Sequence, residues 1–473
     1  MAGEANLTRA PNPQPLATKA AGLFGRDQYV FFLSFVAAMG GFLFGYDLVM
    51  ISGAQIYLRE QFHLGPAAFG FATSSALLGC MLGPTLGAKL CDRLGRKSIL
   101  WLAAVLFTAG AVGTALPKDM ATFNAFRIVG GIGVGLASLA SPMYIAEIAP
   151  ARIRGQLGIM YQLAITIGCL AATVVAYGLA RSLPAEVSWR WMFASIVVPV
   201  LVFAILLLFV PQSPRWLAEQ GRDDEALRVL ADIDPRRDPE LELKEIRSSL
   251  SRQSGSIREL LQPGIRNALF IGITLALLNN WTGWTSVAFY LPTLFQRAGY
   301  AEASSAIGQN IIVQVANVLL TLIAIRLVDR WGRRPLWLTA SAAMSICLLA
   351  AGLVFKFQIT GPLVLVVIMM CMAPHSIGLG PLPWLMMSEI YPTRIRARAV
   401  AISTTFLWLA GFSGPYAFPI LDAASRKAIG SGAGVFWLYS MICIFSLLWG
   451  LKFLPETKGR SLEDIGKLWM RKG

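Results

Sequence analysis

The chain contains the sequence GYDLVMISGA at residues 45–54, which places the carboxylate of Asp47 inside an apolar run, 29–57, that is long enough to cross a membrane. A charged side chain near the bilayer centre costs at least about 2.5 kcal/mol, so acids at this depth usually face a partner or a cavity and usually have a function. Arg127, at the start of the apolar run 128–146, is the matching cation in the first half of the chain. We therefore predict a membrane protein with a functional Asp47–Arg127 pair; an acid that only ties two helices together is the alternative.

The composition is that of a protein with many membrane spans. Of the 473 residues, 56% are hydrophobic and 14% are charged, and the mean hydropathy is +0.60. The net charge of +15 does not predict nucleic-acid binding, because the Lys and Arg residues gather between the apolar runs. The cysteines form no CxxC pair and no phosphate-binding GK[ST] loop occurs, so we predict no disulfide, metal, cofactor or enzyme chemistry. Residues 1–27 lack the apolar core of a cleaved signal peptide.

Twelve apolar runs of helical length predict an all-α polytopic fold. They cover approximately residues 29–57, 68–90, 98–116, 122–146, 157–181, 190–210, 267–296, 304–327, 335–356, 362–388, 398–421 and 433–454. Basic clusters stand at every second joint, which predicts that both termini are cytoplasmic. We expect two pseudo-symmetric six-helix bundles and a helical linker: tail 1–28, first bundle 29–210, cytoplasmic linker 211–266, second bundle 267–454 and tail 455–473.

Two motifs recur in the joints of both predicted bundles. DRLGRK at 92–97 returns as DRWGRR at 329–334, 237 residues later, and EIAPARIR at 147–154 returns as EIYPTRIR at 389–396, 242 residues later. If these motifs only held the orientation of the helices in the membrane, that role would explain their Arg and Lys residues. It would not explain why acidic residues recur at the same spacing in both halves. The nearly constant offset indicates an internal duplication, and membrane proteins built this way commonly bind a substrate between their halves and rock one half against the other.

Taken together, the motifs resemble the sugar porter family of the major facilitator superfamily over nearly the whole chain. Besides those already quoted, the matching stretches are RIVGGIGVGLAS at 127–138, SPMYIAEIAPARIRG at 141–155, PQSPRWL at 211–217, VDRWGRRPL at 328–336, GPLPWLMMSEIYPTRIRARA at 380–399 and PETKGRSLEDI at 455–465. The ordered set is specific, although each stretch alone is weak. The resemblance implies a twelve-helix transporter that works by alternating access.

The repeated charges predict a latch at the cytoplasmic ends of the helices. Its members are Asp92, Arg93, Arg96, Glu147 and Arg154 in the first half and Asp329, Arg330, Arg333, Glu389 and Arg396 in the second. A network of this kind forms when the inner faces meet and breaks when they part; since each exposed ion pair contributes about 0–1 kcal/mol, several are needed. The resemblance implies that it closes the inner gate. Gln212 stands where the family has an acid, whereas Glu456 is retained, so we expect the first half's latch to be weaker.

The helical rise lets Asp47 and Arg127 meet. At about 1.5 Å per residue, both fall in the outer half of the bilayer. An Asp held by Arg stays ionised, and the loss of that partner in a dry site would favour its protonation. The resemblance implies the same role, because proton-coupled members carry Asp here. Gly131 and Gly135, with Gly133, predict close packing of the helix that carries Arg127.

The expected substrate site departs from its family. Gln162, Asn317 and Trp384 match sugar-binding positions, whereas Asn279 and Asn280 replace two Gln, Thr285 replaces Asn, Cys169, Leu407 and Gly411 replace amides, and His375 is unusual. Fewer amides, with Trp281 and Trp284 nearby, suggest a ligand with fewer hydroxyls or with a ring or charge. The other interpretation is that the Trp residues pack and a sugar still binds.

We predict a proton-coupled symporter for a small polar solute, a monosaccharide or polyol, moved by alternating access. Its partners are the substrate, protons and the lipid bilayer of a cell membrane, a bacterial inner membrane in our interpretation, and we expect a monomer. A transporter of a non-sugar cyclic acid or polyol is the alternative within transport, and a non-transporting nutrient receptor on the same scaffold is the alternative from another class.

Overall fold

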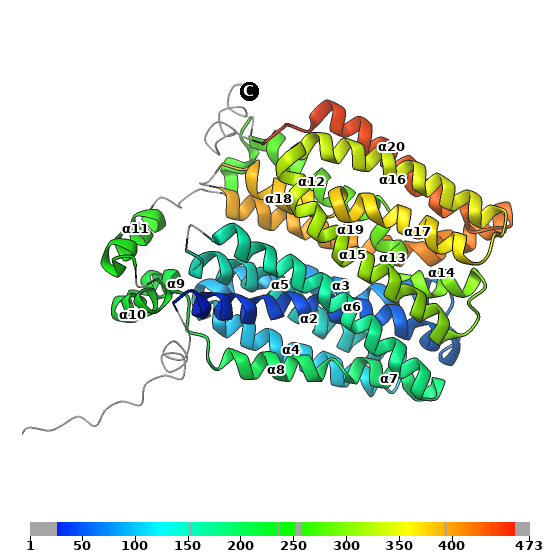
Figure 1. Ribbon diagram of the computed structural model, residues 1–473, viewed down its shortest axis with the longest axis horizontal. Coiled ribbons are helices and arrows are strands. Elements are labelled where there is room, and N and C mark those ends of the chain that lie inside the picture. The colour runs from blue at the N-terminus through cyan, green and yellow to red at the C-terminus, as the bar shows by residue number, and fades with distance from the viewer. Residues whose placement is uncertain are drawn as a thin grey trace, which may run out of the picture.

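The computed structural model describes residues 26–150, 153–234, 236–251, 257–263, 265–392 and 395–458. Two bundles of helices lie side by side, the first half of the chain below the second in Figure 1. The helices of the first half are α2 (Arg26–Gln61), α3 (Pro66–Leu94), α4 (Arg96–Ala115), α5 (Met120–Ile148), α6 (Arg154–Ser182), α7 (Ala185–Ala194) and α8 (Val197–Leu207). The sixth predicted run is thus two helices, which a turn at Ser195 separates.

The second half contains more breaks than the first. Its elements are α12 (Ile265–Trp281), α13 (Trp284–Phe289), α14 (Leu291–Arg297), α15 (Ala303–Trp331), α16 (Arg333–Lys356), α17 (Pro362–Pro374), η2 (His375–Leu379), α18 (Pro381–Glu389), α19 (Arg396–Ile429) and α20 (Ala433–Phe453). Gly283 ends α12 with φ at +101°, a left-handed conformation that glycine adopts at little cost. η2 is a turn of π-helix, a form that often marks functional sites.

Ten helices in the described part of the chain are long and apolar enough to cross a membrane, against twelve predicted runs. The seventh run does not qualify because breaks at Gly283 and Tyr290 divide it into three short helices. The eleventh, α19, is a continuous helix of 34 residues whose Ser, Thr, Gly and Pro residues lower its hydropathy. At these breaks the backbone N–H and C=O groups lose their helical hydrogen bonds inside a bundle. Membrane proteins tolerate this where neighbouring protein segments shield those polar groups from lipid.

The segment between the halves forms short helices, as predicted, at one end of the bundles (Figure 1). These are α9 (Pro214–Glu219), α10 (Asp223–Ile233), α11 (Pro239–Ser251) and the 3₁₀ turn η1 (Ile257–Leu261). They have a small core of their own, in which Trp216, Leu230 and Leu243 are buried. We call this end of the bundles the linker end, and the opposite end, where α7 and α14 lie, the far end.

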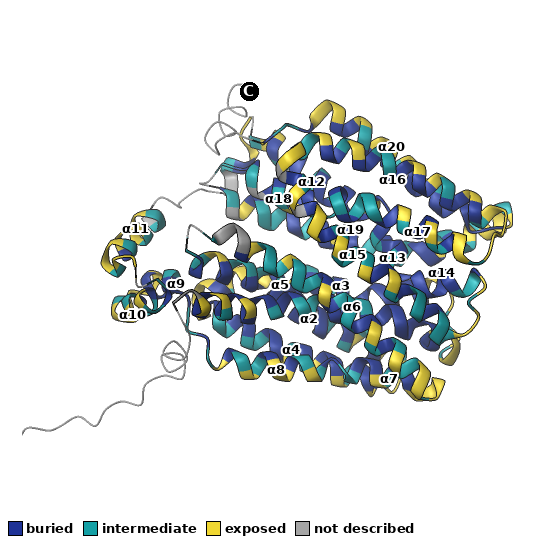
Figure 2. Cartoon of the chain, in the orientation of Figure 1, coloured by how far each residue is buried: buried dark blue, intermediate teal, exposed yellow. Residues whose placement is uncertain are grey.

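The two halves join along two helix pairs, α3 with α19 and α6 with α15. The helices are buried where they face one another and exposed on their outer sides (Figure 2). Many of the exposed side chains are large and apolar, such as Leu201 and Ile205 on α8 and Phe445 and Leu448 on α20. Exposed apolar side chains in this number are expected for helices that lie in lipid rather than in water.

Candidate functional site

Asp47 of α2 and Arg127 of α5 form an ion pair in the core of the first half. The distance between Arg127 Nη1 and Asp47 Oδ1 is 2.9 Å. Both residues are buried, Asp47 with 4% and Arg127 with 2% of its surface exposed. The predicted meeting of the two side chains is therefore confirmed.

The pair is held by a single contact. Asp47 Oδ2 and the Arg127 atoms Nε and Nη2 have no hydrogen-bond partner among the described residues. The Arg127 guanidinium lies over the ring of Phe193, 5.4 Å from its centroid, where cation–π attraction helps to hold it. An Arg can bind a carboxylate through two parallel hydrogen bonds, so this one-point contact leaves both partners with unused hydrogen-bonding capacity. Such a pair can be released more easily than a bidentate one.

Glycines bring the Arg127 helix close to α3. A side chain at Gly131 would place its Cβ 1.9 Å from the carbonyl oxygen of Ala76, and one at Gly135 would lie 2.7 Å from that of Cys80. Neither position can accept even a methyl group without moving backbone. The predicted close packing is confirmed for Gly131 and Gly135, which fix the helix from which Arg127 reaches Asp47, whereas Gly133 lies against Ala103 of α4.

In the second half, Asn279 and Asn280 use their amide groups on backbone carbonyls. Asn279 Nδ2 donates to the oxygens of Leu379 at 2.8 Å and Gly380 at 3.0 Å, at the end of η2. Asn280 Nδ2 donates to Leu407 O at 3.0 Å and to Asn279 Oδ1 at 3.3 Å. Both residues are buried. The two amides thus tie α12 to the π-helical break and to α19, and their donors are occupied in this conformation.

His375 and Asn317 adjoin the same π-helical turn. The ring of Trp284 lies 6.3 Å from that of His375, tilted by 38°. His375 Nδ1 is buried and has no partner among the described residues. Asn317 Oδ1 of α15 accepts a hydrogen bond from Ser376 Oγ at 2.8 Å. The structure therefore gathers four predicted positions around η2: Asn279 and Asn280 on α12, His375 in η2 and Asn317 on α15.

The remaining predicted substrate residues are more accessible. Trp384 on α18 has 39% of its surface exposed, Gln162 on α6 is exposed and Thr285 on α13 is half-buried. Among the described residues, no hydrogen bond joins them to the cluster around η2. Trp281, which we weighed as a ligand contact, is exposed and donates to Ser413 Oγ at 2.9 Å.

Contacts between the halves run along α2, the helix that carries Asp47. Gln55 Nε2 donates to Phe289 O at 2.8 Å, and Ser52 Oγ donates to Ala288 O at 3.4 Å. Both acceptors lie in α13, directly after the Gly283 break. Sequence reasoning missed Gln55, Ser52 and Ser376. A buried amide eight residues after Asp47 in an apolar run was the signal available for Gln55.

The repeated motifs form a charge cluster at the linker end of each half. In the first half, Arg96 Nη2 lies 2.8 Å from Glu147 Oε1, and Ser213 Oγ donates to Glu147 Oε2. In the second half, Arg333 Nη2 lies 2.8 Å from Glu389 Oε1, and Thr457 Oγ1 donates to Glu389 Oε2 at 2.6 Å. The two clusters have the same construction, as the duplication predicts.

The residue at the end of each cluster differs. Glu456 accepts hydrogen bonds from the backbone N–H groups of Arg333 and Arg334, both at 3.0 Å. Gln212 accepts one from Lys97 N at 3.2 Å and donates to Leu94 O at 3.3 Å. Burial raises the pKa of Glu456, but four backbone N–H groups outweigh it and lower the pKa below its ordinary value.

The central acid of each cluster, Glu147 or Glu389, pairs with an arginine of its own half. Asp92, Arg93 and Arg330 are exposed, and Arg396 Nε donates to Tyr391 O at 3.2 Å in its own half. The latch across the halves therefore stays a prediction, because the contacts described here join each central acid to an arginine of its own half. The side chains of Arg154 and Asp329 lie outside the described part of the chain.

Comparisons with known proteins agree with one another. A family model described as sugar (and other) transporter matches residues 33–469. The arabinose-proton symporter of Bacillus subtilis (strain 168) is 39% identical over 450 residues, which cover 94% of this chain and 96% of that protein. The D-xylose-proton symporter of Escherichia coli (strain K12) is 37% identical over 474 residues, with coverage of 94% and 96%. The xylose transporter of E. coli in its inward open conformation has a TM-score of 0.82 at 35% identity and covers 93% of this chain and 100% of that chain.

Proposed function

The chain belongs to the sugar transporter family of the major facilitator superfamily, and on that premise we propose that it is a proton-coupled sugar symporter. Its relatives are transporters, so it is a transporter and not an enzyme. One observation carries the coupling: a carboxylate and a guanidinium, Asp47 and Arg127, are buried in the helical core and joined by one contact. A group that must gain and lose a proton needs a site in which its charge depends on a partner that can be withdrawn.

The coupling we propose runs along α2. With Arg127 in place, Asp47 is ionised; when the arginine moves away in the dry core, protonation of Asp47 becomes favourable. Gln55 and Ser52 lie further along the same helix and contact α13, next to the sugar-site positions on α12 and α13. A shift of α2 on protonation is thereby passed to the second half. The bound proton and the bound sugar then favour the same conformational change.

We propose that this structure represents the inward-facing conformation of the transporter. Two features support this: the hydrogen bonds from Gln55 and Ser52 across the halves, and the similarity to an inward open transporter. We infer that the linker end is cytoplasmic, as are both termini, and that the chain acts as a monomer in a bacterial inner membrane. The charge clusters, including Asp92, Arg93 and Arg330, then act as the cytoplasmic gate when the halves close.

A pentose is the substrate class we propose first. Two relatives are named for arabinose and xylose. In this chain Asn279 and Asn280 use their donors on carbonyl groups, which leaves fewer donors for a sugar. Gln162, Thr285, Asn317, His375 and Trp384 are the remaining positions that we assign to the sugar site. A smaller ligand with fewer hydroxyls suits such a site better than a hexose.

Uptake into proteoliposomes tests this function. Purified protein is reconstituted, an inward proton gradient is imposed, and accumulation is followed for arabinose, xylose, glucose, galactose, a polyol and a cyclic organic acid. We expect accumulation of at least one pentose that disappears when a protonophore dissipates the gradient. Accumulation of only the organic acid, or uptake of a sugar that the gradient does not affect, would contradict the proposal.

A further inference from the structure

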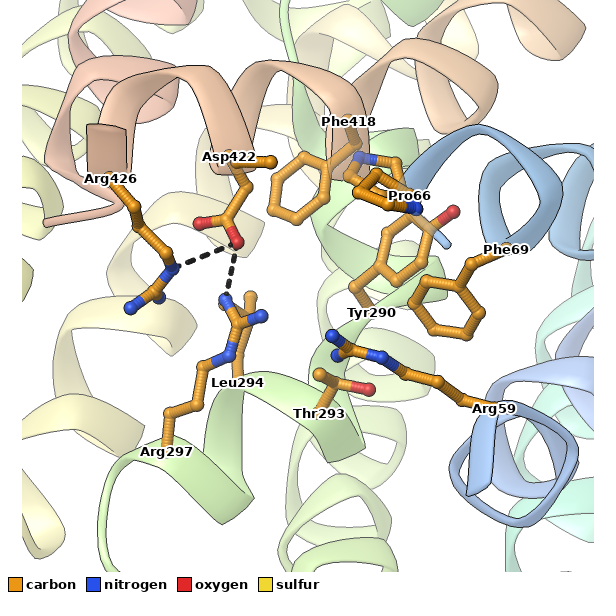
Figure 3. Close-up of a pocket in the computed structure, with 12 residues that line it drawn as sticks. Arg59, Pro66, Phe69, Tyr290, Thr293, Leu294, Arg297, Phe418, Asp422 and Arg426 are labelled. Carbon is orange, nitrogen blue, oxygen red and sulfur yellow. Dashed lines mark hydrogen bonds and ion pairs between the residues drawn. The ribbon is translucent and has the colours of Figure 1, made fainter. Parts of the chain in front are cut away.

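A cavity of about 350 Å³ lies between the two halves at the far end and is not part of the sugar or proton sites. The first half contributes Arg59 of α2 and Phe69 of α3; the second half contributes Tyr290, Arg297 of α14 and Asp422 and Arg426 of α19, among others (Figure 3). A water occupies about 30 Å³ in the liquid, so the cavity has room for a small ion with several waters.

The cavity has more positive than negative charge. Three arginines and one aspartate line it. Arg297 Nη1 and Arg426 Nε both contact the same oxygen of Asp422, Oδ2, at 2.9 Å and 3.1 Å. This one carboxylate therefore offsets one of three guanidinium charges. The side chains of Arg297 and Arg426 retain further N–H groups that those two contacts do not use.

Arg59 supplies the charge without a counterion. Among the described residues it makes no ion pair, and its guanidinium lies over the ring of Phe69, 5.3 Å from the centroid. In Figure 3 it extends toward the space that Arg297 and Asp422 face from the other half. Guanidinium groups from both halves thus converge on one cavity, a geometry that suits an oxyanion with several acceptor oxygens.

We propose that this cavity binds one phosphate-type oxyanion. The anion bridges Arg59 of the first half and the two arginines of the second half, Arg297 and Arg426. The site exists only while the halves meet at the far end, because its cations come from both. An anion that binds this conformation and not the opposite one stabilises it by mass action. Phosphate on the far side of the membrane should therefore slow transport. This consequence rests on the alternating access proposed above, whereas the binding itself does not.

Thermal unfolding of the purified full-length protein in nanodiscs of zwitterionic lipid tests the binding. Sodium phosphate is titrated at constant ionic strength against sodium chloride. We expect phosphate, and not chloride, to raise the unfolding temperature of the wild type in a saturable way. Arg59→Gln and, separately, Arg426→Gln should weaken the apparent affinity at least tenfold. Lys118→Gln removes an exposed cation at the same end but outside the cavity, and should leave it unchanged.

Lipid composition and transport distinguish the remaining possibilities. If phosphatidylglycerol in the nanodisc suppresses the phosphate response of the wild type, a lipid headgroup is the natural source of the phosphate; if it does not, the ligand is a soluble oxyanion. No saturable response, or the same affinity in both arginine variants as in the wild type, would overturn the site. Binding that is lost in Arg59→Gln, with uptake that phosphate does not slow in the wild type, would retain the site and contradict only the transport mechanism.

Discussion

The two halves share a fold and a duplicated charge cluster, but their cores contain different chemistry. The first half buries an ion pair, Asp47 with Arg127, whereas the second buries neutral amides, Asn279 and Asn280, beside a π-helical turn. Among the described residues of the second half, the one carboxylate buried to a similar degree is Asp422, at the far end. This difference suggests that the two halves have different functions: the first half binds the proton and the second half recognises the sugar. Coupling then depends on contacts between the halves.

Removing the cation of the pair should have the largest effect. Arg127→Leu leaves Asp47 buried without its partner, and breaking a buried pair in this way typically costs about 3–5 kcal/mol. We expect a strongly lowered unfolding temperature and no transport, while Arg181→Leu, on an exposed side chain, changes neither. The double variant Asp47→Leu with Arg127→Leu should recover stability but not accumulation. Normal stability of the single variant would show that the pair is not a stabilising element of the first half.

The matched change in the second half should affect affinity and leave coupling intact. Asn280→Ala removes the amide that donates to Leu407 O and joins α12 to α19, a hydrogen bond whose net contribution is about 0.5–1.5 kcal/mol. Because this contact positions α12 beside the sugar site, we expect sugar affinity to fall by up to about tenfold, since each 1.4 kcal/mol is tenfold. The ratio of protons to sugar, measured from simultaneous fluxes, should not change. A changed proton-to-sugar ratio would contradict the assignment of proton binding to the first half and sugar recognition to the second.

The charge clusters should behave alike in the two halves. Glu147→Ala and Glu389→Ala each remove the acid that binds the local arginine, so the cytoplasmic gate that we propose would lose members that it needs to close. We expect several-fold slower transport with sugar binding retained. Thiol labelling of Ala146→Cys, an exposed position at the linker end of α5, should rise in both backgrounds. Unchanged labelling in either would argue against a gating role for that cluster.

The smallest effect should come from exchanging Gln212 and Glu456. The pKa of Glu456 is lowered from its ordinary value of 4.5, so its carboxylate stabilises the fold above that value, and this stabilisation is lost as the pH falls through the lowered pKa. Glu456→Gln should flatten the acid side of the stability profile, and Gln212→Glu should steepen it. Unfolding temperatures between pH 3 and 7 measure both. Identical stability profiles for the wild type and both variants would mean that Gln212 and Glu456 do not make the two charge clusters differ in acid sensitivity.

Much of this organisation was predictable because charge in an apolar run is rare. Asp47 and Arg127 stood out on that ground, and helical rise placed them at a common depth. The break at Gly283 and the π-helical turn at His375 were not predictable, since a glycine inside an apolar run is compatible with a continuous helix. The partners of Asn279 and Asn280 were missed because they are backbone carbonyls from distant segments. Likewise, the repeated acids and arginines predicted a charge cluster. Their spacing does not show whether the ion pairs form within one half or between the two halves.

The central claim is that Asp47 carries the coupled proton, and Asp47→Asn tests it most directly. The amide is nearly the same size as the carboxylate and can still accept a hydrogen bond from Arg127, but it cannot take up a proton at physiological pH. The measurement is made on one batch of proteoliposomes in two modes: accumulation under an imposed proton gradient, and exchange of labelled for unlabelled sugar without a gradient. We predict that the variant loses accumulation and retains exchange. Accumulation by Asp47→Asn at the wild-type level would contradict the account.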